Sequence, residues 1–333
     1  MHSKLNTGNI SEDKIQAELN RKANRKQKIT AILPFMGLIV VILLFTILTN
    51  GQFISGSNLS LLLNQCYVMV VVIIGGAFLY SIGGLDMAIG TVMGISAMVM
   101  TLLLNSGVPI LVSFVIGILL SIGLMSITAC AKNFLGITPF IASMCVMNVC
   151  QGIMLAVTAK IGTITFPYSR FLWLDTIPAR IILLAALLIV GYVLFNLTSY
   201  GKSLKAIGGN PTVARISGVR VELITWLAYA TIGFTLAVGA IFSLMRAGVA
   251  DTAIGSGFNL NVMTAIVLGG FPLTGGANAK FSAPVIGALT VTCLTNGLAL
   301  LGQTSYTGYA VKGVLFLIVV GLTYEKSNGK LIS

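Results

Sequence analysis

Asp86 is the residue whose type and setting could do chemistry, because it lies in GGLDMAIG (83–90), within one of the most apolar parts of the chain. A carboxylate inside a membrane span costs free energy and often marks a proton or cation pathway. Acid–base or nucleophilic catalysis would need a titratable partner beside it. The sequence places no acidic residue or histidine near Asp86, and the one histidine is His2. These residues therefore give no support for an enzyme.

Gly201-Lys202-Ser203 resembles the end of a nucleotide-binding P-loop, GxxxxGK[ST]. That pattern requires glycine at position 196, where this chain has Asn196, and it follows a strand rather than an apolar helix. The five cysteines form no CxxC pair and lie in or beside apolar runs, as small buried hydrophobic residues do. We therefore expect no catalytic residue, metal site, disulfide framework or cofactor on this chain.

The elements that position Asp86 must be membrane helices. Of the 333 residues, 56% are hydrophobic and only 8% are charged, whereas about a quarter are charged in soluble domains. The net charge of +12 does not indicate nucleic-acid binding, because the basic residues cluster at the ends of apolar runs. The length of a membrane span predicts an all-α polytopic bundle of about ten spans: 30–49, 60–81, 87–104, 109–130, 137–158, 179–197, 222–243, 260–271, 284–301 and 308–323.

These spans divide the chain into a basic N-terminal tail, 1–29, a transmembrane domain, 30–323, and a C-terminal tail, 324–333. Basic residues concentrate on the side of the N-terminal tail, so both termini are predicted to be cytoplasmic. The tail shows no small-residue cleavage site of a signal peptide. Two connections are long: 159–178, assigned outside, and 198–221, assigned inside. The sequence therefore predicts a multi-pass membrane protein without an extramembrane domain.

The inside connection contains Gly208-Gly209-Asn210-Pro211. Glycine and asparagine tolerate left-handed backbone, and proline favours the first turn of a helix. Asn210 is predicted to cap a short helix that runs to about Ser217, after which Gly218 ends it. A short helix held on the cytosolic face suits the docking of another protein; the alternative is a plain connecting loop.

Four stretches, in order along the chain, resemble the ribose-type (simple sugar) ABC transporter permease family. They are GGLDMAIGTVMGISAMVM (83–100), ITPFIASM (137–144), AIGGNPTVARISGV (206–219) and GSGFNLNVMTAIVLGGFPLTGG (255–276). The resemblance covers about residues 55–320. It implies the membrane subunit of a bacterial, binding-protein-dependent importer for a sugar or sugar-like solute in the inner membrane.

The resemblance also implies partners: two ABC ATPase subunits that carry ATP and Mg, a periplasmic substrate-binding protein, and a second permease subunit in a homo- or heterodimer. Membrane lipid is a further partner, whereas nucleic acid is not expected. Segment 206–219 becomes the element that couples ATP hydrolysis to transport. A runner-up from another class is an ion-coupled secondary carrier that uses Asp86. The coupling residues implied by the resemblance are Gly208, Gly209, Asn210, Ala214, Arg215, Ser217 and Gly218.

Where the family has "YELDA", this chain has Phe258-Asn259-Leu260-Asn261-Val262, so two carboxylates have become amides. Either the solute differs or the chain pairs with a non-identical permease that keeps the acids. Amides can bond sugar hydroxyls, although such residues also commonly form interhelical hydrogen bonds. The candidates for the translocation path are Asn64, Gln65, Phe140, Asn148, Asn259, Asn261 and Asn296. Gln151, in the same span as Asn148, is a further polar residue that could face the path.

Paired glycines mark the predicted turns and hinges. Gly83 and Gly84 allow a tight reversal, after which Asp86 is predicted to cap a helix that begins at Met87 and to meet the positive end of its dipole. Direct contact of Asp86 with solute is the alternative. The full set of predicted turn or hinge residues is Gly83, Gly84, Asp86, Gly269, Gly270, Gly275 and Gly276.

Overall fold

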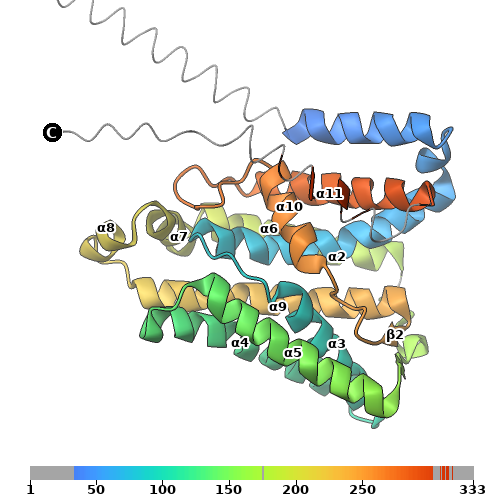
Figure 1. Cartoon of the computed structure of the whole chain (residues 1–333), viewed down its shortest axis with the longest axis horizontal. Helices are drawn as coiled ribbons and strands as arrows, with labels where there is room; N and C mark the ends of the chain where they lie inside the picture. Colours follow the sequence, from blue (N-terminus) through green and yellow to red (C-terminus); the bar gives the residue numbers. More distant parts are fainter. Residues whose placement is uncertain are drawn as a thin grey trace, which may run out of the picture.

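The computed structural model describes residues 34–174 and 176–302, together with positions 308, 310, 311, 313, 314 and 317. Over this part the chain is a bundle of apolar helices (Figure 1). A helix over Pro34–Leu48 comes first. The elements that follow are η1 (Gln52–Ile54), α2 (Gly56–Ser81), α3 (Ile89–Asn105), α4 (Ile110–Leu135), α5 (Pro139–Ile161), β1 (Ile164–Thr165), η2 (Tyr168–Phe171), α6 (Ile177–Asn196), α7 (Ser199–Gly209), α8 (Pro211–Ile216), α9 (Val221–Ala247), β2 (Val249–Ala250), α10 (Phe258–Leu268) and α11 (Ser282–Leu300).

Six of the described helices are long and apolar enough to cross a membrane: α2, α4, α5, α6, α9 and α11. Three shorter apolar helices accompany them: Pro34–Leu48, α3 and α10. Each predicted span from 30–49 to 284–301 thus contains one helix, which confirms the polytopic α-helical bundle. The predicted tenth span, 308–323, lies mostly outside the described residues, and both tails, 1–29 and 324–333, lie wholly outside them. The count of ten spans and the cytoplasmic termini stay predictions.

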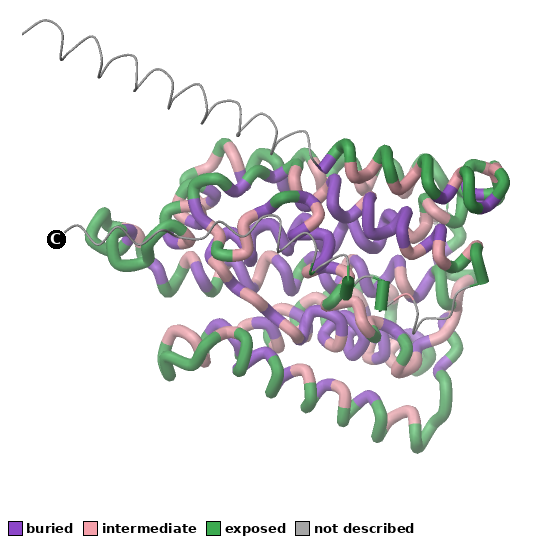
Figure 2. Tube along the Cα trace, turned by 45° about the horizontal axis from the view of Figure 1, so that its top comes forward, coloured by how far each residue is buried: buried purple, intermediate pink, exposed green. Residues whose placement is uncertain are grey.

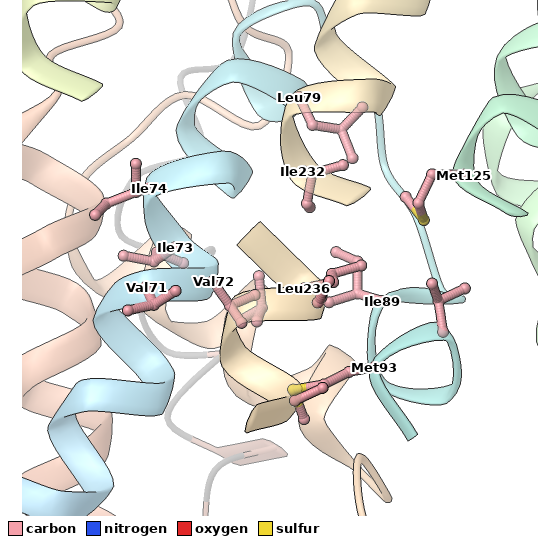
Figure 3. Packing of buried hydrophobic residues seen from close by; sticks show 14 of the residues in the cluster. Val71, Val72, Ile73, Ile74, Leu79, Ile89, Met93, Met125, Ile232 and Leu236 are labelled. Atoms are coloured by element: carbon pink, nitrogen blue, oxygen red, sulfur yellow. The ribbon is translucent and has the colours of Figure 1, made fainter. Parts of the chain in front are cut away.

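α2 and α9 form the centre of the bundle. Val71, Val72 and Ile73 of α2 are completely buried, as are Ile232 and Leu236 of α9, and Figure 3 shows Val72 of α2 pointing toward α9 within this core. A methyl group on Gly75 would lie 2.1 Å from Thr235 Oγ1 and 2.8 Å from the Ile232 Cα. Small residues let membrane helices approach closely, so the second half of α2 is packed as a core helix.

Burial falls from this centre toward the periphery (Figure 2). α6 has the smallest buried share of the six long helices, and α4 and α5 also expose one side. The described part departs from a purely helical fold at one place, where β1 pairs antiparallel with β2 and Ile164 faces Ala250. β2 lies at the opposite end of the bundle from α7 and α8 (Figure 1), so the two ends differ in construction.

Candidate functional site

α8 is the short helix predicted between two spans, and its ends lie where the sequence indicates. The Asn210 Oδ1 accepts hydrogen bonds from the backbone N–H groups of Thr212, at 2.9 Å, and Val213, at 3.2 Å. Pro211 occupies the first turn. Gly218, with φ of 85°, follows the helix in left-handed backbone. This confirms the predicted cap and stop.

α8 projects at one end of the bundle (Figure 1) and exposes two large apolar side chains there. Val213 is 58% exposed and Ile216 is 82% exposed, whereas Ala214 is buried against the bundle. Arg215 forms an ion pair with Glu222 in the first turn of α9. Both charged side chains are exposed, so the pair orients α8 more than it stabilises it. An apolar surface on a rigid, capped helix can dock a partner protein.

α7 corrects one expectation, because the sequence indicates loop over its residues and a turn at Gly208-Gly209. The helix instead runs from Ser199 through both glycines, and the Thr198 hydroxyl oxygen accepts from the Gly201 N–H at its start. A methyl group on Gly208 would lie 1.9 Å from the Ser81 carbonyl oxygen and 2.4 Å from the Gly276 nitrogen. Gly208 is therefore required for close approach and not for left-handed backbone.

Three segments that are distant in the sequence meet at this point, which we call the glycine junction: Ser81, Gly83, Gly208, Gly275 and Gly276. The Gly276 N–H donates to the Ser81 carbonyl oxygen at 3.1 Å. A methyl group on Gly275 would lie 2.1 Å from the same oxygen, and one on Gly83 would lie 3.1 Å from the Thr274 oxygen. The three junction glycines other than Gly208 have positive φ. The junction joins α7 to the end of α2 by backbone contact.

Asp86 lies in the chain that leads from the junction to α3. Its side chain is 4% exposed, and the Oδ1 accepts a hydrogen bond of 2.7 Å from the Ala88 N–H. The Ser143 Oγ of α5 accepts from the neighbouring Met87 N–H at 3.0 Å. The helix itself begins at Ile89, two residues later than expected, with Ala88 as its N-cap. The predicted cap is therefore wrong: Ala88 is the N-cap, no side chain caps the helix, and Asp86 instead bonds the backbone of the turn that precedes it.

The other predicted hinge residues form turns or close contacts. A methyl group on Gly84 would lie 2.7 Å from Leu79 Cδ1, and one on Gly269 would lie 2.1 Å from the Ala283 oxygen. Gly270 follows in left-handed backbone, with φ of 72°. Gly84 therefore allows the chain to fold back on α2, and the Gly269–Gly270 pair lets it turn from α10 toward α11.

A hollow of about 240 Å³ lies beside the start of α3. Its polar lining comes from Thr91 of α3, Asn148 and Gln151 of α5, Ser256 before α10, and Asn259 of α10. We call these five residues and the space between them the amide hollow. Within the described chain, none of its lining residues carries a charge. Amide and hydroxyl groups both donate and accept hydrogen bonds, so the amide hollow suits a neutral, hydroxylated solute.

Two glycines hold the wall of the amide hollow against α3. A methyl group on Gly90 would lie 2.1 Å from the Gly255 oxygen, and one on Gly255, where φ is 81°, would lie 1.9 Å from the Gly90 oxygen. The Asn259 Nδ2 lies 3.4 Å from the Met87 sulfur, to which it donates. The Asn148 Nδ2 donates to the Met144 carbonyl oxygen of its own helix at 2.8 Å. Both amide oxygens remain acceptors that a solute can use.

The structure brings together only two of the seven predicted path residues, Asn148 and Asn259. Asn296 is buried, and its amide exchanges two hydrogen bonds with Asn58, at 2.9 and 3.0 Å, between α11 and α2. This is the interhelical bond that the sequence left open as an alternative. Asn64 accepts from Arg180. Gln65 and Asn261 are half-buried on α2 and α10, and Phe140 is exposed at the start of α5.

Gln151, the further polar residue that the sequence offers beside Asn148, lines the amide hollow with it, because a spacing of three residues places both side chains on one face of α5. Thr91 and Ser256 also belong to the amide hollow, although the sequence does not single them out. Ser256 and Thr91 lie on segments that meet only through the Gly90–Gly255 contact, which the sequence does not reveal.

Comparison with known proteins shows that this chain matches a known family. Residues 58–320 match the family model described as "Branched-chain amino acid transport system / permease component". The chain is 30% identical over 303 residues to the ribose import permease protein of Bacillus subtilis strain 168, covering 88% of this chain and 92% of the relative.

Two further relatives are sugar permeases. The D-allose transport system permease protein of Escherichia coli K12 is 28% identical over 294 residues, covering 86% of this chain and 90% of the relative. The galactose/methyl galactoside import permease protein of Salmonella typhimurium LT2 is 30% identical over 310 residues, covering 85% and 91%. No solved structure gives a significant match.

Proposed function

The chain belongs to this family of transport-system permease components, and on that premise we propose that it is the membrane-spanning permease of an ABC importer for a sugar or sugar-like solute. A separate ATPase subunit binds ATP and Mg, and a periplasmic binding protein delivers the solute. The observation that carries the proposal is the glycine junction. There α7, which leads into the exposed helix α8, packs against the end of α2. From the end of α2 the chain leads to the start of α3, beside the amide hollow. The amide hollow is the part of the path that this subunit contributes.

The chemistry of the amide hollow supports a neutral, hydroxylated solute. Its polar lining consists of amides and hydroxyls, so it offers hydrogen bonds without a fixed charge for a carboxylate or an ammonium group. The names of three relatives point the same way, since they are permeases for ribose, allose and galactose. The relatives give no support to a carrier driven by ions through Asp86. The Asp86 side chain is enclosed, with Oδ1 bonded to the backbone and Oδ2 without a hydrogen-bond partner among the described residues.

The exposed face of α5 supports a second permease subunit. Asn148 is exposed there beside apolar residues such as Met144 and Val149. Uncovered amides on a spanning helix are unfavourable in hydrocarbon, so this face lies against a second subunit or the solute path. A homodimer and a heterodimer are distinguished by whether the purified importer contains one permease species or two.

The proposed function also implies the orientation of the protein in the membrane. α8 faces the cytoplasm, where the ATPase subunit is, and both termini are on that side of the inner membrane. The opposite end, with β1 and β2, faces the binding protein. Labelling single cysteines placed at Ile216 and at Thr165 with a membrane-impermeant thiol reagent tests this in intact cells. Labelling at Thr165 and protection at Ile216 is expected, and the reverse pattern overturns the orientation.

Uptake into proteoliposomes that contain the permease, its ATPase and its binding protein tests the function. We expect ATP-dependent uptake of one member of a panel of pentoses, hexoses and related polyols, unaffected by a protonophore. Branched-chain amino acids serve as the comparison solutes and should not be taken up. Uptake that proceeds without ATP and collapses with a protonophore would establish the carrier instead.

A further inference from the structure

Three side chains of the amide hollow have a hydrogen-bond donor that the protein already uses. The Thr91 hydroxyl donates to the Ala88 carbonyl oxygen at 3.0 Å. The Asn148 amide donates to a carbonyl oxygen of its own helix, and the Asn259 amide donates to a methionine sulfur. In each case the protein engages an N–H or O–H group of the lining residue. The side-chain oxygen of each residue keeps lone pairs for a ligand.

Thr91 faces the hollow as an acceptor only. A carbonyl oxygen cannot donate, so the proton in the contact with Ala88 belongs to the Thr91 hydroxyl. The hydroxyl has no second proton, whereas its oxygen still has lone pairs. The β-branched side chain is stiff, and the bond to the preceding turn of α3 favours its present rotamer. A ligand that bonds Thr91 must therefore bring the proton itself.

Asn148 and Asn259 have a defined orientation for the same reason. A backbone carbonyl oxygen and a thioether sulfur carry no proton to donate, so the nitrogen of each amide must face them. Each amide then keeps its oxygen and one N–H for a ligand. Together with Thr91, these residues bring acceptors from α3, α5 and α10 to the wall of one hollow. Three oxygens but only two N–H groups remain among them.

We propose that the amide hollow recognises its solute through the protons of the solute's hydroxyl groups, with Thr91 as a specificity-determining acceptor. The inference rests on the proposed function and narrows its substrate class to solutes with free hydroxyls at the positions that meet these oxygens. A methoxy group or a fluorine at such a position sets one acceptor against another and leaves the protein oxygen unpaired. Sites built around a substrate hydroxyl discriminate strongly against analogues that lack it.

Replacements of Thr91 test its role in proteoliposomes that contain the full importer. Thr91→Val keeps the β-branched shape but removes the acceptor, and it should raise the solute concentration for half-maximal uptake about tenfold. Thr91→Ser restores the acceptor and should recover most of this loss. Thr101→Val is the matched control, because Thr101 of α3 forms the same kind of bond, to the Ala97 oxygen at 2.9 Å, but is buried outside the hollow. It should leave the half-maximal concentration unchanged.

Deoxyfluoro sugars test the direction of the hydrogen bond, since a fluorine can accept weakly but cannot donate. The parent probes are D-ribose, D-allose and D-galactose. For each parent that is taken up, its deoxyfluoro analogues are compared with it at concentrations that saturate the binding protein. At least one analogue should be taken up about tenfold less well than its parent by the wild-type importer. For one position this difference should disappear in Thr91→Val, because the acceptor that the hydroxyl met is gone.

The outcomes separate this inference from the proposed function. Uptake of a parent sugar together with equal uptake of all its deoxyfluoro analogues, or an equal effect of Thr91→Val and Thr101→Val, overturns the inference alone. Wild-type importer that takes up no sugar overturns the proposed function as well. Should the binding protein reject the analogues, the three threonine variants decide the question. Should Thr91→Val fail to fold, the analogues decide it with the wild-type importer.

Discussion

The Gly276 N–H donates a hydrogen bond of 3.1 Å to the Ser81 carbonyl oxygen, and Gly208 of α7 packs directly against that same oxygen. The end of α2, the turn before α11 and the helix preceding α8 therefore share one backbone contact. Closely packed interiors transmit displacement because they hold few voids. We therefore expect a movement of α8 to reach the segment that carries Asp86 through this contact.

Ile216→Glu tests the docking surface of α8. Ile216 is 82% exposed, and a carboxylate there should reduce the amount of ATPase subunit that co-purifies about tenfold, as the loss of a central apolar contact does. Phe134→Glu is the matched control, since Phe134 is equally exposed at the neighbouring end of α4. Equal retention of the ATPase in the two variants would show that α8 does not dock it.

Two replacements of Asp86 separate the role of its hydrogen bond from the role of its charge. Asp86→Asn keeps an oxygen for the Ala88 N–H and should leave uptake near normal. Asp86→Leu removes the acceptor, leaves the buried Ala88 N–H without its partner, and should destabilise the protein by about 1–3 kcal/mol. Thermal unfolding in detergent and uptake are measured for both. An Asp86→Asn protein that is stable but transports nothing would mean that the charge itself drives transport.

If the amide hollow binds the solute, its asparagines should determine the apparent affinity of uptake. Asn148→Leu and Asn259→Leu should each raise the solute concentration for half-maximal uptake about tenfold, because each removes one or two hydrogen bonds. Cys145→Leu, on the exposed face of α5 but outside the hollow, should leave uptake unchanged. The result that contradicts this site is normal uptake in both asparagine variants.

Asn58 and Asn296 are expected to affect stability and not solute choice. Each single change to leucine leaves one buried amide without its partner and should cost about 1–3 kcal/mol. The double replacement should cost less than the sum of the two, since it leaves neither amide unpaired. The free energies of unfolding of the wild-type protein, the two single variants and the double variant give the coupling energy between the two asparagines. Additive losses, or a changed solute preference in Asn296→Leu, would contradict the pairing.

The sequence predicts local features of this protein well where a few neighbouring residues determine them. Asn210, Pro211 and Gly218 predict α8 because a cap, a first-turn proline and a terminal glycine act within one short segment. The apolar runs predict the helices for the same reason. These inferences need no knowledge of what the segment packs against.

Prediction fails where a partner distant in the sequence decides the role. The sequence predicts a turn at Gly208, but the residue is helical. Its lack of a side chain allows Ser81 and Gly276 to approach closely. For Asn296 the sequence leaves both a path residue and an interhelical hydrogen bond open, and only the contact with Asn58, from the far end of the chain, decides for the bond. Thr91 and Ser256 gain a shared hollow only through the contact of Gly90 with Gly255.

Replacing Gly208 tests the coupling through the glycine junction most directly, and Gly209 is its matched control. A methyl group on Gly208 would lie 1.9 Å from the Ser81 oxygen, whereas one on Gly209 meets no atom within 4 Å. ATP hydrolysis and uptake are measured together in proteoliposomes of the full importer. Gly208→Ala should keep the ATPase subunit bound and hydrolysing ATP while losing most uptake, and Gly209→Ala should transport normally. Equal uptake by the two variants would contradict the account.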